Sequence, residues 1–120
     1  MAVGHNDVSH YLPLTSVSFE ILLALADTER HGYAVMQEVE RSTEGVTSLR
    51  PGTLYRAINR LLESGLIEES HERPAEGEDD ERRRYYRLTT LGRDVASAEA
   101  ARLAAAVESA RDKKLLQRNA

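Results

Sequence analysis

Residues 50–62 have the sequence RPGTLYRAINRLL, and this stretch decides which fold the chain adopts. Pro51 is tolerated in the first turn of a helix, and Gly65 is the usual left-handed residue just beyond a helix end. Apolar residues recur at i, i+3, i+4, i+7 and i+8, which predicts a helix with one buried stripe. The stripe consists of Leu54, Ala57, Ile58, Leu61 and Leu62.

The opposite face of this predicted helix is polar and basic, with Thr53, Arg56, Asn59, Arg60 and Glu63. From Arg50 to Leu62 there are three arginines and no carboxylate, although the formal net charge of the chain is -4. Binding of a polyanion depends on where charge lies on the surface, so the acidic total does not exclude a nucleic-acid partner.

Composition limits the classes of protein. The chain has 120 residues, 41% of them hydrophobic and 30% charged, which predicts one globular domain with an appendage. The absence of cysteine excludes disulfides and cysteine metal sites and favours a reducing cytoplasm. The N-terminus lacks a signal-peptide pattern, and no stretch approaches the roughly eighteen apolar residues of a membrane span. We therefore expect a cytoplasmic protein with no membrane partner.

Two further helices precede the quoted stretch. Residues 15–29 carry Thr and Ser as N-caps and apolar side chains around most of the helix circumference, which predicts a central helix. Residues 31–45 follow a turn at His31 and end at Gly45, which predicts a second, shorter helix. Residues 1–14 are predicted to form an N-terminal arm.

A hairpin and a long helix follow it. Residues 66–73 and 82–89 are predicted strands, and the loop between them holds Pro, Gly and acidic residues. Alternation along the second strand places one of Tyr85 and Tyr86 inside and the other outside. From Thr90 to Gln117 helix-forming residues predict one long helix, on whose surface Glu99 and Arg102 are expected to pair weakly.

This order predicts a mainly α fold with a small β-hairpin, namely a winged helix-turn-helix at residues 15–89 and a C-terminal helix at residues 90–120. In that fold the third helix enters the major groove of double-stranded DNA and the hairpin lies along the backbone. Arg56 and Arg60 suit guanine edges or phosphates, and Asn59 suits adenine.

The stretches ILLALADTERHGYAVMQEV, GTLYRAINRLLESGLIEE and RRRYYRLTTLG resemble, in this order, the PadR family of transcriptional regulators. The resemblance covers roughly residues 15–95. It implies a winged helix with an added C-terminal helix, an active homodimer, and repression relieved by a small ligand. It also implies that Thr53, Tyr55 and Arg56 begin the recognition helix and that residues 83–87 form the returning wing strand.

The predicted DNA-binding residues are Arg50, Thr53, Tyr55, Arg56, Asn59, Arg60, Arg82, Arg83 and Arg84. Two alternatives stand beside this prediction: the polar stripe is only a solvated helix face, or Tyr55 packs under the wing. The loop from Glu76 to Glu81 is unusually acidic for a wing tip. Either it projects away and the arginines at 82–84 take over the phosphate contact, which we favour, or its acids pair with those arginines.

The last helix carries apolar residues at a heptad spacing, namely Ala96, Ala100, Leu103, Val107 and Ala110. We define these five residues as the seam. A helix of this length spans about 37 Å at 1.5 Å per residue, which is longer than one small domain covers. We therefore expect a homodimer and a palindromic operator, with the alternative that the seam covers its own domain.

Evidence for other kinds of site is weak. A small-molecule effector pocket is expected near Phe19, Leu22, Val95 and Leu103, although such residues are more often core. The four histidines lack metal-ligand spacing and the acidic loop lacks the calcium-loop pattern. No catalytic nucleophile, metal or cofactor motif is found, so we expect no enzyme. The alternative function is a winged-helix module that binds an acidic protein instead of DNA.

Overall fold

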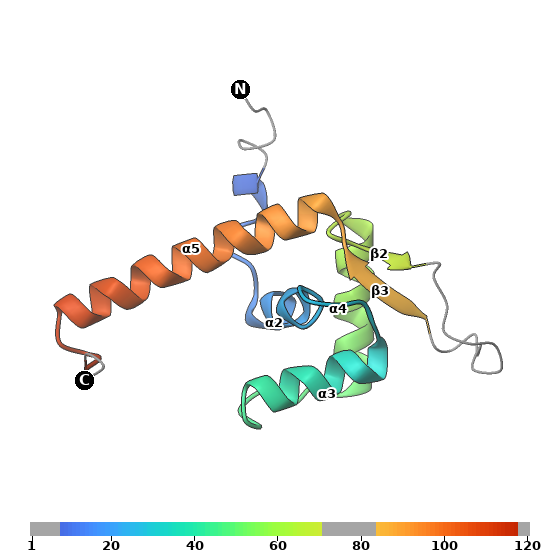
Figure 1. Cartoon of the computed structure of the whole chain (residues 1–120), viewed down its shortest axis with the longest axis horizontal. Coiled ribbons are helices and arrows are strands. Elements are labelled where there is room, and N and C mark those ends of the chain that lie inside the picture. The colour runs from blue at the N-terminus through green and yellow to red at the C-terminus, as the bar shows by residue number, and fades with distance from the viewer. Residues whose placement is uncertain (1–7, 71–83, 118–120) are drawn as a thin grey trace.

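The structure is a computed structural model that describes residues 8–70 and 84–117. Its helical elements are η1 (Ser9–Tyr11), α2 (Ser16–Ala24), α3 (Gly32–Ser42), α4 (Pro51–Glu63) and α5 (Thr90–Asp112). Its strands are β1 (Arg30–His31), β2 (Ile67–Ser70) and β3 (Tyr85–Leu88). The predicted architecture, mainly helical with a small sheet, is confirmed (Figure 1).

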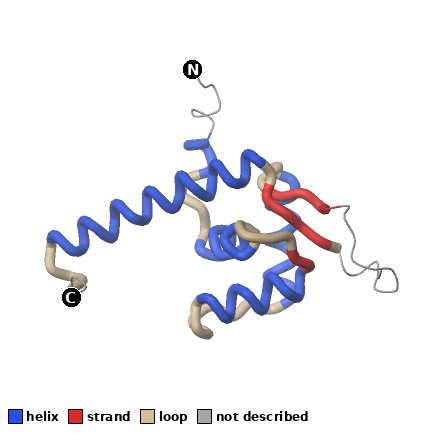
Figure 2. The backbone as a smooth tube through the Cα atoms, viewed as in Figure 1, coloured by secondary structure: helices blue, strands red, loops and turns tan. Residues whose placement is uncertain are grey.

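The sheet has three antiparallel strands in the order β1-β3-β2, so it is larger than the predicted two-stranded hairpin. In β2 and β3, Ile67 lies opposite Leu88 and Ser70 opposite Tyr85. The third strand, β1, pairs Arg30 with Tyr86 just before α3 begins. Figure 2 shows this short strand directly before α3, and its pairing with β3 attaches the helical part of the chain to the wing.

One hydrophobic core joins all four α-helices. Fully buried side chains include Leu22 of α2, Val35 of α3, Leu54 of α4 and Val95 of α5. Contacts between elements connect α2 with α3, α4 and α5, so α2 is central, as the sequence predicts. The first half of α5 packs on this core, and its second half projects away from the domain (Figure 1).

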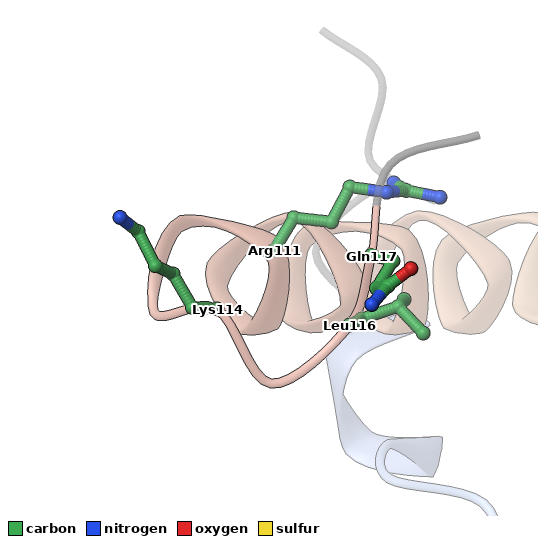
Figure 3. Close-up of a pocket in the computed structure, with 4 residues that line it drawn as sticks. All are labelled: Arg111, Lys114, Leu116 and Gln117. Carbon is green, nitrogen blue, oxygen red and sulfur yellow. The ribbon is translucent and has the colours of Figure 1, made fainter. Parts of the chain in front are cut away.

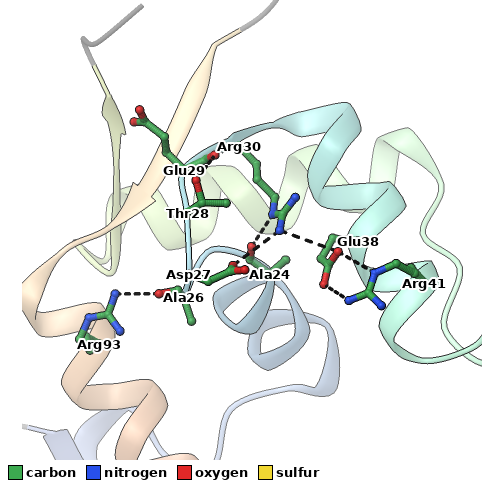
Figure 4. Close-up of polar contacts among 9 residues, drawn as sticks. All are labelled: Ala24, Ala26, Asp27, Thr28, Glu29, Arg30, Glu38, Arg41 and Arg93. Carbon is green, nitrogen blue, oxygen red and sulfur yellow. Dashed lines mark hydrogen bonds and ion pairs between the residues drawn. The ribbon is translucent and has the colours of Figure 1, made fainter.

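Helix α2 ends at Ala24, five residues before the predicted end at position 29. The segment that follows is fixed by arginines from elsewhere in the chain (Figure 4). Arg30 Nε donates to the Ala24 carbonyl at 2.7 Å, and Arg93 of α5 donates to the Ala26 carbonyl at 3.0 Å. The first bond satisfies a carbonyl group that the end of the helix leaves without a partner, and the second holds the turn that follows.

The turn after α4 sets where the wing begins. Gly65 has φ +80°, as predicted for a left-handed residue beyond the helix, and Leu66 N–H donates to the Leu61 carbonyl at 3.0 Å. The Leu66 carbonyl in turn accepts from Thr89 N–H at 3.1 Å, and Thr89 Oγ1 caps α5 by accepting from Gly92 N–H at 2.9 Å. The start of α5 is therefore joined directly to the start of β2.

Candidate nucleic-acid interface

Helix α4 separates a buried face from a polar one, as predicted. Leu54, Ala57, Ile58 and Leu61 are buried and Leu62 is half-buried. Arg56, Asn59 and Arg60 are exposed, and Thr53 is half-buried. The polar side chains that the sequence assigns to DNA therefore lie on the outer surface of the domain.

The arginines of the described residues fall into two groups. Six of the ten, namely Arg30, Arg41, Arg84, Arg87, Arg102 and Arg111, form ion pairs with carboxylates. A seventh, Arg93, donates to a backbone carbonyl. The remaining three, Arg50, Arg56 and Arg60, have no ion pair or side-chain hydrogen bond within residues 8–70 and 84–117, and all three belong to the stretch 50–62.

A groove of about 460 Å³ runs between α4 and the first turn of α2. Its lining consists of Thr15, Ser16, Val17, Ser18, Thr53, Arg56, Ala57 and Arg60. Two guanidinium groups and several hydroxyl groups thus face one open space, and no acidic residue lines it. The sequence did not assign the α2 side of this groove to the interface, because only the folded chain brings these residues beside α4.

Tyr55 lies on the other flank of α4. A Cβ atom added to Gly32 would overlap the Tyr55 ring, so this ring packs closely over the first residue of α3. Burial first, and then the negative charge of Glu69 and the nearby Tyr55, raise the pKa of Tyr86 on the wing strand. The ring of Tyr55 therefore lies between α4 and the start of α3, and 41% of the surface of this residue remains exposed.

The described part of the wing holds its arginines in ion pairs. Arg84 Nη1 lies 3.2 Å from Glu69 Oε2, and Arg87 Nε lies 2.9 Å from Glu68 Oε2. These carboxylates come from β2. The alternative left open by the sequence was instead a pairing of the wing arginines with the acidic residues of the wing tip. Arg82, Arg83 and the tip from Glu76 to Glu81 lie outside the described residues.

The two wing tyrosines differ in burial. Tyr86 is buried, and Tyr85 is half-buried with its ring edge-on to His31, at 5.3 Å between centroids and 88° between planes. His31, expected only in a turn, ends β1 and caps α3, because its Nδ1 accepts from Ala34 N–H at 3.3 Å. An imidazole acceptor at this position has no clear sequence signal, since the preferred N-cap residues are Ser, Thr, Asp and Asn.

Helix α5 carries its seam from the core out to solvent. Ala96 packs against the core, but residues 100–109 are all exposed, including Leu103 and Val107. Beyond α5 the chain turns back at Lys114, which has φ +65°. A hollow of about 490 Å³ at this end is lined by Arg111, Lys114, Leu116 and Gln117, whose side chains are drawn in Figure 3.

Comparison with known proteins identifies the family. The model of the "Transcriptional regulator PadR-like family" matches residues 21–98. The chain belongs to the PadR-like family. Transcriptional regulator Rv3488 of Mycobacterium tuberculosis is 40% identical over 78 residues, which are 65% of this chain and 66% of that protein.

Solved structures of similar proteins have the same fold as this PadR-like chain. A transcriptional regulator from Clostridium thermocellum superposes with a TM-score of 0.66 at 21% identity, over 92% of this chain and 97% of the other. A PadR family transcription regulator from Clostridium difficile R20291 gives 0.67 at 23% identity, over 80% and 95%. The winged helix-turn-helix predicted from the sequence is thereby confirmed.

The residues expected to form an effector pocket divide into two pairs. Phe19 and Leu103 line a groove of about 270 Å³ between α2 and α5, with Leu14, Ser16, Glu20, Glu99 and Arg102. Leu22 and Val95 are fully buried in the core of this PadR-like domain and do not line the groove. The sequence could not separate the two pairs, because all four are apolar residues and only the packing of α2 and α5 shows which of them face the groove.

Glu99 lies in the wall of this groove, and it is not the weak surface partner that the sequence predicts. Only 2% of its surface is exposed, and Arg102 donates to its two carboxylate oxygens at 2.9 and 2.8 Å. The hydrogen bonds from Arg102, and to a smaller extent a backbone hydrogen bond from Leu14, hold the pKa of Glu99 below its ordinary value. The segment before α2 covers this side chain, which helix periodicity does not reveal.

No three His, Asp or Glu side chains among the described residues are grouped so that they could hold a metal ion. None of the helices that the structure describes is long and apolar enough to cross a membrane.

Proposed function

We propose that this PadR-like protein is a sequence-specific DNA-binding repressor that acts in the cytoplasm as a homodimer, without enzymatic activity. The observation that supports DNA binding is the distribution of arginine partners. Seven described arginines are engaged within the protein, whereas Arg50, Arg56 and Arg60 have no ion pair or side-chain hydrogen bond with another described residue, and they lie together on or beside the outer face of α4. Exposed, unpaired guanidinium groups on a winged-helix recognition helix suit phosphates and guanine edges.

In the proposed complex, α4 enters the major groove. Arg56 and Asn59 approach base edges, where a good bidentate contact discriminates against a wrong base by about 1–3 kcal/mol. Thr53, Tyr55 and Arg50 approach phosphates near the start of the helix, and the arginines at 82–84 approach the backbone along the wing. Contacts to phosphate position the protein and contacts to bases give sequence preference.

A second copy is proposed to cover the outer half of α5. This helix has 23 residues, or about 34 Å at 1.5 Å per residue, and its residues 100–109 are exposed in the single chain. Pairing along the seam would set two α4 helices about one DNA turn, roughly 34–36 Å, apart on a palindromic operator.

The oligomeric state tests this pairing. Val107→Asp, which puts a charge in the seam, is expected to give monomers in sedimentation. Ala105→Asp, on the opposite side of the helix, is the matched control and should leave the dimer intact.

Release from DNA by a small ligand is proposed to act through the groove between α2 and α5. Phe19 and Leu103 supply apolar walls, and Glu20 and Arg102 supply polar groups at its margin. The volume of about 270 Å³ lies just below the range of about 300–1,000 Å³ that is usual for small-ligand sites. Because Leu103 belongs both to the groove and to the seam, a ligand there would change how the two copies pack.

The function is tested by selecting binding sites from a random duplex pool and measuring affinity for the selected operator. We expect Arg56→Ala and Arg60→Ala each to weaken operator binding by about 1–3 kcal/mol. Arg41→Ala removes the same charge from α3, where it is exposed and paired with Glu38, and serves as the control. Unchanged operator affinity in both α4 variants would contradict the proposal.

A salt series separates this function from a module that binds an acidic protein. DNA binding that releases counterions weakens steeply as salt rises. A chain that binds no duplex at low salt is instead expected to use the basic face of α4 for a protein partner.

A further inference from the structure

We infer that the groove between α2 and α4 is a seat for one backbone phosphate of the bound duplex. In this arrangement Arg60, with Thr53 and the first turn of α2, holds the phosphate, while Arg56 and Asn59 remain over the bases. The inference rests on the proposed DNA-binding function and goes beyond it in two ways. It assigns Arg60 to a phosphate and Arg56 to the bases, and it adds α2 to the interface.

The helical positions on α4 support this division. At 3.6 residues per turn, Thr53 and Arg60 lie within about 20° of each other around the helix, whereas Asn59 lies about 100° from Arg60. Thr53 and Arg60 accordingly line the groove and Asn59 does not. Arg56 lies between these directions and also lines the groove, but its Nη1 is 3.5 Å from where a Cβ of Gly52 would stand, so its guanidinium lies along the first turn of α4.

The α2 side of the groove offers donors without partners. Thr15 Oγ1 is engaged, since it accepts from Ser18 N–H at 3.1 Å. The hydroxyl groups of Ser16 and Ser18 make no hydrogen bond within the described part of the chain. Ser16 is exposed and Ser18 is half-buried, so a ligand can reach the hydroxyl of Ser16 without rearrangement of the helix.

The chemistry of the lining selects a phosphodiester. Its charged groups are Arg56 and Arg60, both without carboxylate partners among the described residues, and its other polar groups are hydroxyls. Guanidinium and hydroxyl groups are the usual donors to the phosphate oxygens of DNA. The seat also lies next to the face of α4 proposed to enter the major groove, so a phosphate on the adjoining backbone is the ligand within reach.

The test uses the full chain and its selected operator, with each phosphate in turn replaced by a neutral methylphosphonate. For the wild-type protein, neutralising one phosphate per half-site is expected to weaken binding about tenfold, as for a lost hydrogen bond to a charged group. In Arg60→Ala that substitution should have no further effect. Ser16→Ala should show a smaller loss at the same phosphate, and Arg41→Ala should retain the wild-type pattern.

Base preference supplies the second measurement. Arg60→Ala and Ser16→Ala are expected to weaken operator and unrelated duplex by the same factor, with the salt slope for Arg60→Ala reduced by about one. Arg56→Ala should instead lower the preference for operator over unrelated duplex. The replaced side chains, except that of Arg41, line the groove between α2 and α4. Melting curves of each variant therefore check that the replacement leaves the fold unchanged.

The outcomes distinguish the two proposals. If the wild-type protein binds no duplex, the proposed function fails. If it binds the operator but Arg60→Ala alters base preference and Ser16→Ala matches the wild type, the phosphate seat is refuted and the proposed function stands. Saturable binding of inorganic phosphate alone that disappears in Arg60→Ala, with no methylphosphonate effect on operator binding, would reassign the groove to a free anion and also refute the seat.

Discussion

Gly92→Ala tests how the wing is attached to α5. A Cβ atom at position 92 would overlap the carbonyl oxygen of Leu66, and would lie 2.8 Å from its carbonyl carbon and 3.2 Å from its Cα. These are backbone atoms at the start of the wing, so rotation of a side chain cannot relieve the overlap. The start of α5 and the start of β2 must move apart instead.

The magnitude follows from what this movement breaks. The Leu66 carbonyl accepts from Thr89 N–H at 3.1 Å and from Thr89 Oγ1 at 3.2 Å, and each bond contributes about 1 kcal/mol. Residual overpacking adds about 2 kcal/mol. Alanine gains back about 1 kcal/mol because it favours helix over glycine. We therefore expect a loss of about 3 kcal/mol, or roughly 15 °C in melting temperature for a domain of this size.

Urea unfolding followed by circular dichroism, at one protein concentration, measures this loss. Gly52→Ala is the matched control, since its Cβ would meet only Arg56 Nη1 at 3.5 Å, which is an ordinary contact with the end of a flexible side chain. The control has no overlap to relieve and keeps the gain of alanine over glycine in a helix, so it should be as stable as the wild type or up to about 1 kcal/mol more stable. A Gly92→Ala protein as stable as Gly52→Ala would refute the close approach between α5 and the wing.

Two further predictions concern carboxylates that hold arginines. Glu69→Gln releases Arg84 from its ion pair on the wing, and since an exposed pair contributes at most about 1 kcal/mol, duplex affinity should rise about two- to fivefold in a low-salt titration. Glu99→Gln removes an acid whose pKa is lowered, chiefly by hydrogen bonds from Arg102, so the carboxylate stabilises the protein above its ordinary pKa of about 4.5. That stability is lost as pH falls through the lower folded pKa. Melting curves should separate wild type and Glu99→Gln at pH 7 and bring them together at the acid end, and parallel curves at all pH values would contradict the assignment.

Local signals account for what the sequence predicted well. Pro51, Gly65 and the apolar stripe of α4 lie within one segment, and each has a single favourable structural interpretation. Their agreement with the structure follows because a strongly two-sided helix has only one way to bury its apolar face. Because that apolar face is buried, Arg56 and Arg60 lie on the opposite, exposed face of α4.

Long-range contacts account for what the sequence missed. β1 is only two residues long and has no alternating pattern of its own, because its partner is β3, more than fifty residues later. The early end of α2 likewise depends on Arg30 and Arg93, which bond to carbonyls before and after the turn (Figure 4). The α2 side of the groove was missed for the same reason, since Ser16 and Thr53 meet only in the folded chain.

The acidic total of the chain strengthens the case for binding through α4. On the wing, on α3 and on α5, the carboxylates of Glu69, Glu38 and Glu99 hold the nearby arginines in ion pairs. This pairing neutralises much of the competing positive surface, so that among the described residues the guanidinium groups with neither an ion pair nor a side-chain hydrogen bond are confined to the stretch 50–62. The other described cations without an ion pair are Arg93, which donates to a backbone carbonyl, and Lys113 and Lys114 just beyond α5. Around the helical domain, a polyanion is therefore drawn toward the α4 face, which orients the encounter as well as strengthening it. A protein basic on all sides would bind duplex more tightly but with α4 less often in the groove.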